Sequence, residues 1–334
     1  MTNRALRPTG KANDPEQDGW ISALPVIDAH HHFWDLDRNY HPWLCDEPMI
    51  PFRYGSYAPI RRNYLPADYL LDTGRFNLAG SVYVEAEWDP RDPVGETRWI
   101  HGIAAEHGLP GAVVAQAWLD HDDAAAVLAA QAAFPLVRSV RHKPRSAAAP
   151  GAAIRGAPGS MDDPRWRDGY ARLQGHGLHF DLQTPWWHFE AAGDLARDFP
   201  ATRIIINHTG LPADRSAAGL AAWRDAMARL ADAPNVHLKI SGIGVPGQPW
   251  SVELQRSVVH DALAIFGIER CLFASNFPVD SVIATFEQIY RGFLTLTAHL
   301  DDAARRRLFH DNAAALYRVE PRAPRADRRF PFPA

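Results

Sequence analysis

Residues 27–35 read IDAHHHFWD and place three histidines at the end of a short apolar run. In a β-strand, alternate side chains share one face, so we expect His30 and His32 to point together while His31 points away. Two imidazoles on one face can bind a divalent metal ion or hydrogen-bond a substrate oxyanion. The stretch therefore predicts a strand whose carboxyl end carries a functional site.

Seven further apolar, β-rich runs follow, separated by longer segments of helical periodicity. Short strands without polar alternation are typical of parallel strands that are covered on both faces. The eight predicted strands are Pro25–Ala29, Gly80–Val84, Gly111–Ala117, Leu136–Val140, Leu178–Leu182, Arg203–Asn207, Val236–Ile240 and Cys271–Ser275. The clearest predicted helices are Gly95–His107, Asp120–Phe134, Met161–Gly175, Leu220–Ala231, Ser251–Phe266 and Val282–Leu300, with Asp120 and Ser251 as expected caps.

Eightfold alternation of strand and helix predicts an α/β fold, either a barrel or a doubly wound sheet. Polar residues gather just after the carboxyl ends of the strands, which is where barrel enzymes carry their chemistry. We therefore predict a single-domain (β/α)8 TIM barrel over residues 25–318. An N-terminal arm (residues 1–24) and an extended C-terminal tail (residues 319–334) are expected to flank it.

Composition excludes several classes of function. The 334 residues carry a net charge of −4, which gives no electrostatic case for binding nucleic acid or an anionic membrane. No segment approaches the ~18 apolar residues of a membrane helix, and residues 1–20 do not read as a signal peptide. Cys45 and Cys271 lack metal-ligand spacing, so we expect free thiols in a reducing cytoplasm. The sequence also lacks the nucleotide-binding glycine motifs and HExxH.

One connection is unusually long and aromatic. Residues 33–66 follow the first predicted strand and include Trp34, Trp43 and Phe52. Long loops in a compact domain are usually functional. We expect this loop to form a wall over the barrel mouth, with Trp34 contacting the substrate, and its exposed aromatic side chains suggest a homodimer.

The chain resembles the amidohydrolase superfamily, in particular the amidohydrolase-2 branch that contains sugar lactonases and pyrone-dicarboxylate lactonase. The D-x-H-x-H pattern of residues 28–32 carries this resemblance. It continues through SVYVEAEWDP, VRSVRHKP, FDLQTPWW, IIINHTGLP, VHLKISGIG and LFASNFPVD, and so spans Val26 to about Tyr317. The resemblance implies a distorted (β/α)8 barrel with a hydrolytic site at its C-terminal face.

The resemblance also implies roles for two strand-end residues. His208 closes the sixth predicted strand, where the family's residue binds metal or polarises the substrate carbonyl. Asn276 stands where the wider superfamily has an aspartate at the end of strand eight. An amide cannot accept a proton near neutral pH, although it can orient water or donate to an oxyanion. Another group must therefore be the general base, with Glu85 as first candidate, followed by Asp280 and His208.

Other polar residues are candidates for substrate binding. Arg141 ends the fourth predicted strand in RHK, and its planar guanidinium matches a carboxylate. Gln183, Trp186 and Asp280 are further candidates for the pocket. Lys239 on the seventh predicted strand is ambiguous between the barrel interior and the outer layer.

We expect a hydrolase that opens a small acidic or sugar-derived lactone. His30, His32 and His208 would polarise the carbonyl or hold a divalent metal ion, with zinc as the expected metal. Two alternatives stay open, a metal-dependent non-oxidative decarboxylase of an unsaturated or aromatic acid and a non-catalytic barrel that binds a small ligand. The absence of a carboxylate at Asn276 counts against the decarboxylase and motivates the non-catalytic alternative.

Overall fold

Eight parallel strands form the centre of the computed structural model, which describes residues 19 and 21–320. Each strand pairs with the next one along the chain, in the order β1 to β8. The strands are β1 (Pro25–His31), β2 (Asn77–Val84), β3 (Ala112–Gln116), β4 (Val137–Arg141), β5 (His179–Leu182), β6 (Ile204–Ile206), β7 (Val236–Ile240) and β8 (Cys271–Phe273). All eight predicted strands are present, and the predicted TIM barrel is confirmed.

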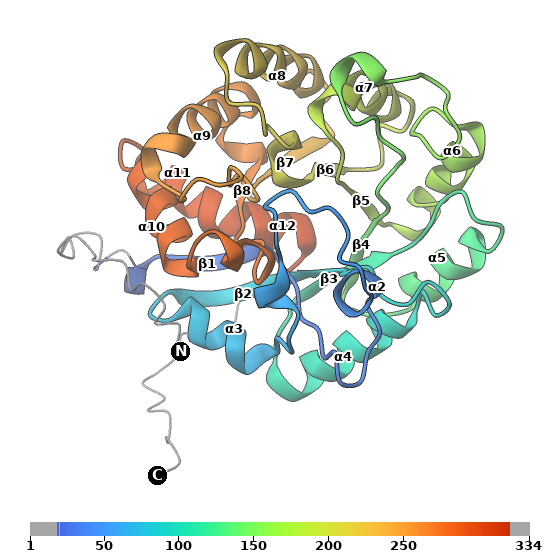
Figure 1. Ribbon diagram of the computed structural model, residues 1–334, viewed down its shortest axis with the longest axis horizontal. Coiled ribbons are helices and arrows are strands. Elements are labelled where there is room, and N and C mark those ends of the chain that lie inside the picture. The colour runs from blue at the N-terminus through green and yellow to red at the C-terminus, as the bar shows by residue number, and fades with distance from the viewer. Residues whose placement is uncertain (1–18, 20, 321–334) are drawn as a thin grey trace.

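Most of the helices form an outer ring around these strands, whereas α2 (Pro42–Cys45) and α12 (Asn312–Tyr317) lie within that ring (Figure 1). The helices of the described chain are α2 (Pro42–Cys45), α3 (Pro66–Thr73), α4 (Gly95–His107), α5 (Ala124–Ala132), α6 (Pro164–Ala171), α7 (Phe189–Asp198), α8 (Ala217–Ala231), α9 (Val252–Phe266), α10 (Phe286–Leu296), α11 (Asp302–Arg306) and α12 (Asn312–Tyr317). Short 3-10 segments and one π-helical turn at Arg307–Asp311 join several of them.

Some predicted helix bounds match the structure and others do not. Helix α4 has the predicted bounds, and the Ser251 side chain accepts a hydrogen bond from the Leu254 backbone at the start of α9. Asp120 was wrong as a cap, because α5 begins four residues later, after Asp123. Helices α3 and α7 were not among the clear predictions.

The barrel closes between β1 and β8 through a buried carboxylate. Asp28 accepts hydrogen bonds from the backbone N and the hydroxyl of Ser275, at 2.8 and 2.6 Å. It also accepts from the hydroxyls of Tyr69 on α3 and Tyr290 on α10, at 2.8 and 3.1 Å. Asp28 is fully buried, and burial raises its pKa while these donors act in the opposite direction. One side chain thus links β1 to the segment that follows β8 and to two helices.

The amino end of the barrel is plugged by the C-terminal segment. Leu316, Tyr317 and Val319 pack with the inward-facing apolar residues of the strands. A Cβ atom on Gly80 would lie 2.8 Å from Cγ1 of Val319, so only glycine fits there without displacement. The open end is therefore the carboxyl end of the strands.

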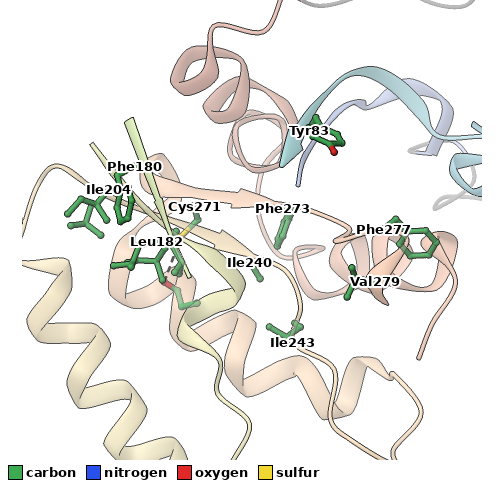
Figure 2. Packing of buried hydrophobic residues seen from close by; sticks show 14 of the residues in the cluster. Tyr83, Phe180, Leu182, Ile204, Ile240, Ile243, Cys271, Phe273, Phe277 and Val279 are labelled. Carbon is green, nitrogen blue, oxygen red and sulfur yellow. Dashed lines mark hydrogen bonds between the residues drawn. The ribbon is translucent and has the colours of Figure 1, made fainter. Parts of the chain in front are cut away.

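A larger apolar layer lies between the strands and the helices. Phe180 and Leu182 of β5, Ile204 of β6, Ile240 of β7 and Phe273 of β8 are buried in it (Figure 2). These residues alternate along each strand with residues that face the interior, which is why the predicted strands look uniformly apolar.

The packed body reaches beyond both predicted domain boundaries. Ile21 and Leu24 are buried in the apolar core although they fall within the predicted arm, and Val319 is buried although it begins the predicted tail. The rest of the arm and tail lies outside the described residues, which include residues 19, 21–24, 319 and 320 of these segments. Within the described chain, no helix is long and apolar enough to cross a membrane. Cys45 and Cys271 are free thiols, as predicted.

Replacing Asp28 should destabilise the whole barrel. Asp28→Ala leaves four buried donors without their acceptor, and we expect a loss of about 3 kcal/mol or more in the free energy of unfolding. Tyr290→Phe removes one donor and should cost about 1 kcal/mol. Urea unfolding followed by circular dichroism measures both, with the exposed Asp232→Ala as control. An Asp28→Ala variant as stable as that control would show that the carboxylate does not hold the barrel closed.

Candidate active site

His30, His32 and His208 meet at the carboxyl end of the barrel. The Nε2 atoms of His30 and His32 are 3.2 Å apart, and the ring centroids of His30 and His208 are 4.7 Å apart. His31 points away, with its ring stacked on Tyr69 and its Nε2 2.9 Å from the hydroxyl of Ser81.

A β-bulge in β1 gives the histidines this orientation. The register changes from Asp28 opposite Ser81 to His31 opposite Tyr83, so β1 gains one residue relative to β2. Ala29 packs in the barrel interior, and His30, the next residue, also faces inward. Without the bulge, strict alternation would put His30 on the outer side together with Asp28.

Hydrogen bonds and burial make this cluster a set of neutral imidazoles. Nδ1 of His32 lies 2.7 Å from the carbonyl oxygen of Val84, which can only accept, so the proton is on Nδ1 and Nε2 carries a lone pair. Nδ1 of His208 lies 3.0 Å from the hydroxyl of Ser241. Burial lowers the pKa of His30, His32 and His208 well below the ordinary value, and neighbouring histidines and cations act in the same direction.

Local backbone geometry holds His208 in the site. His208 and Thr209 both have left-handed φ angles, 54° and 56°, and the indole of Trp223 donates to the Thr209 carbonyl at 2.9 Å. A Cβ atom on Gly242 would lie 2.5 Å from Nδ1 of His208. Gly242, the first glycine of the SGIG stretch, therefore leaves space for the imidazole of His208.

The histidines supply only part of a metal site. Two imidazole ligands on one tetrahedral zinc lie about 3.3 Å apart, close to the separation of His30 and His32. Within the described residues, however, no group of three or more His, Cys, Asp or Glu side chains is arranged to hold a metal ion. Strand eight offers the amide of Asn276 in place of a carboxylate. The donors as placed do not complete a zinc cage, and we assign no chemical step to a metal.

Asn276 is held between the histidines and a buried acid. Its backbone N donates to the His30 carbonyl at 2.8 Å, and its Nδ2 donates to Oδ1 of Asp280 at 2.6 Å. Oδ1 of Asp280 is also 3.5 Å from Nη2 of Arg53. Burial raises the pKa of Asp280 to about 6, against the opposing effects of Arg53 and Asn276. Asp280 thus orients Asn276 and anchors a cation.

Glu85 and Arg141 form a buried ion pair. Nε of Arg141 donates to Oε1 of Glu85, while Oε2 of Glu85 accepts from the backbone N of Glu87 at 2.8 Å. Nη1 of Arg141 donates to Oε1 of Gln183 at 3.0 Å. Both oxygens of Glu85 therefore have protein partners, which favours a structural role for Glu85 over that of general base.

A cavity of about 390 Å3 opens onto the cluster. Its polar lining comes from His32, Arg53, Glu87, Arg141, Lys143, Gln183, His208 and Asn276, and the aromatic loop adds Trp43, Ile50 and Phe52. Arg53 was not among the predicted site residues. The only sequence feature that indicates a role for it is its position in the long aromatic loop, residues 33–66. Nη1 of Arg53 is buried and has no hydrogen-bond partner among the described residues.

Three other candidates lie elsewhere. Trp34 is fully buried behind His32, with the two rings stacked at 6.3 Å, and its indole donates to the Arg62 carbonyl. Trp186 packs edge-on against Trp187, at 5.5 Å between centroids. Lys239 lies in the barrel interior, where its Nζ is 2.6 Å from Oδ1 of Asp181. Trp34 therefore supports the histidine cluster from behind, and Lys239 is not in the outer layer.

Restoring a carboxylate on strand eight should complete a metal site. Asn276→Asp places a carboxylate beside three neutral imidazoles, and we expect it to retain about one zinc ion per chain after dialysis. The wild type and Asn276→Ala should retain much less, as measured by mass spectrometry of the metal content. A wild-type protein that keeps one zinc per chain would contradict the incomplete donor set.

Comparisons with known proteins identify the family and the fold of this chain. The family model described as amidohydrolase matches residues 27–319. The uncharacterized protein y4mH of Sinorhizobium fredii is 39% identical over 299 residues, covering 90% of this chain and all of that protein. An L-fucono-1,5-lactonase of Burkholderia ambifaria is 28% identical, and the match covers 88% of this chain and 96% of that protein.

A solved structure is also similar. The crystal structure of an amidohydrolase from Burkholderia multivorans with bound HEPES superimposes with a TM-score of 0.72 at 25% identity, over 88% of this chain and 99% of that one. The chain belongs to the amidohydrolase family of enzymes.

Proposed function

We propose that this enzyme hydrolyses the ester bond of a small sugar-derived or acidic lactone. The observation that carries this proposal is the position of His208, a neutral imidazole that lines the cavity beside Arg53. Arg53, Arg141 and Lys143 face this cavity with Glu87 as the one carboxylate in its lining. Such a charge balance favours a carboxylate product and a developing oxyanion.

His208 is the imidazole best placed to accept a proton. His32 uses Nδ1 for the Val84 carbonyl, and its Nε2 faces His30. His208 holds the Ser241 hydroxyl through Nδ1, which leaves Nε2 for the cavity. A neutral imidazole can act as a general base near pH 7.

The reaction follows from these positions. His208 accepts a proton from water as the water oxygen forms a bond to the lactone carbonyl carbon. The oxyanion that develops is stabilised by Arg53, whose Nη1 is free to donate. The bond between the carbonyl carbon and the ring oxygen then breaks, and His208 returns the proton to the leaving alkoxide, giving a hydroxy acid.

The relatives support a sugar lactone as the substrate. Two proteins named L-fucono-1,5-lactonase, 28% and 26% identical, match most of this chain. We place the activity in the cytoplasm because both cysteines are free thiols. The expected zinc binding by His30, His32 and His208 is untested; the incomplete donor set argues against it, and the metal content of the wild type beside the Asn276 variants tests it.

Acid release from a panel of aldonolactones and carboxylated lactones tests the function. We expect turnover of at least one sugar-derived or acidic lactone, and His208→Gln should lower kcat/KM by roughly 100-fold or more because the general base is lost. The exposed His176→Gln serves as a matched control and should keep wild-type turnover.

Two outcomes would contradict the proposal. Release of carbon dioxide from aromatic acids without lactone hydrolysis would favour the decarboxylase. Tight binding of a lactone without turnover would favour the non-catalytic barrel.

A further inference from the structure

A second cavity of about 410 Å3 adjoins the first. Trp43, Ile50, Glu87, Arg141 and Lys143 line both cavities. A substrate that reaches beyond these five residues would therefore occupy both spaces, with one end at the histidines. We call the second cavity the adjoining subsite.

Part of the wall between the cavities is an ion pair at the surface. Lys143 Nζ pairs with the carboxylate of Glu87, and the two side chains are 38% and 44% exposed. Ion pairs with this exposure contribute little to stability, so a substrate group can displace this one. Glu87 has a left-handed φ of 56°, and its backbone N is held by Glu85 at 2.8 Å. The backbone of Glu87 is therefore held in place, whereas the side chains of Glu87 and Lys143 can move aside for a substrate group.

The apolar lining of the adjoining subsite consists of flat surfaces. The indoles of Trp43, Trp88 and Trp118 line it, together with the prolines Pro42, Pro48 and Pro90. Flat apolar side chains of this kind pack against the C–H face of a ring. The shape and surface therefore suit a ring rather than a linear chain.

The polar lining distinguishes one class of ring from another. Gln116 is 4% exposed, and its Oε1 is buried with no hydrogen-bond partner among the described residues. An acceptor without a partner at the wall of a cavity calls for a donor such as a hydroxyl group. Glu85, Glu87 and Asp46 add carboxylates to the lining.

The charge balance of the adjoining subsite disfavours an anion. Its three carboxylates face only two cations, Arg141 and Lys143. His142 also lines it, but burial lowers the pKa of this histidine to about 4, so it is neutral at pH 7. The first cavity has the opposite balance, with three cations and one carboxylate.

We propose that the adjoining subsite binds a neutral sugar ring that the substrate carries as a substituent on its lactone ring. This inference rests on the proposed lactone hydrolysis and names the class of substrate as a glycosylated aldonolactone. The lactone lies in the first cavity at His208. The sugar ring packs on the indoles, and one of its hydroxyls donates to Gln116.

Turnover of matched lactones tests the inference. We compare gluconolactone with cellobionolactone, which carries one additional glucosyl ring, and with a phenyl-substituted lactone. The wild type should prefer cellobionolactone in kcat/KM. Trp118→Ala and the volume-conserving Gln116→Leu should each lower that value by about tenfold, since each removes one ring contact or hydrogen bond. Both variants should leave gluconolactone turnover within about twofold of the wild type. The half-buried Trp187→Ala, which lies outside both cavity linings, should retain the preference.

The outcomes separate this inference from the proposed function. Turnover of gluconolactone without a preference for the disaccharide lactone would overturn the subsite and leave lactone hydrolysis standing. A preference for the phenyl lactone would also overturn it, in favour of an aromatic ring. If no lactone is opened, titration of tryptophan fluorescence with cellobiose decides the subsite separately. Wild-type binding that Trp118→Ala and Gln116→Leu both weaken supports it, and no binding contradicts it.

Discussion

The structure depends on the burial of one carboxylate, that of Asp28. A buried acid is costly unless its oxygens are hydrogen-bonded, and the donors to Asp28 come from the segment directly after β8 and from α3 and α10. Because these donors are distant in sequence, they meet only when the ring of strands closes. Closure brings His30 beside Asn276, whose backbone N donates to the His30 carbonyl. Asp28, the acid of the D-x-H-x-H pattern, thus stabilises the closed barrel, and the closed barrel brings the site residues together.

The closed barrel places three neutral imidazoles beside cations that are paired with carboxylates. His30, His32 and His208 are buried and neutral, while the cations Arg53 and Arg141 face the same cavity. With Asn276 in place of an acid, no carboxylate from strand eight enters the cluster directly, and Asp280 stands one hydrogen bond further away. Arg141 is paired with Glu85 and Arg53 with Asp280, but Nη1 of Arg53 has no hydrogen-bond partner among the described residues and can donate to a developing oxyanion. This is the property that ester hydrolysis needs.

Much of the fold and the centre of the site could be predicted from sequence because short-range rules decide them. Apolar runs gave all eight strands, and the position of His208 at a strand end placed it at the barrel mouth. Longer-range effects were out of reach. Arg53 enters from a loop whose course depends on packing, and the partner of Glu85 is Arg141, 56 residues further on. Trp34 looked like a mouth residue, but it is fully buried and its indole donates to the carbonyl of Arg62 instead. The outward or inward direction of His30 also depends on a bulge that no sequence pattern marks.

The protonation state of the three imidazoles is the most direct test of this account. Nitrogen-15 NMR of histidine-labelled protein, assigned with single His→Gln variants, reports which ring nitrogen carries the proton. We predict that His30, His32 and His208 are all neutral at pH 7, with the His32 proton on Nδ1, and that they stay neutral well below pH 6.5. If these three residues titrate together with the exposed histidines, or if His32 carries its proton on Nε2, the buried neutral cluster does not exist as described.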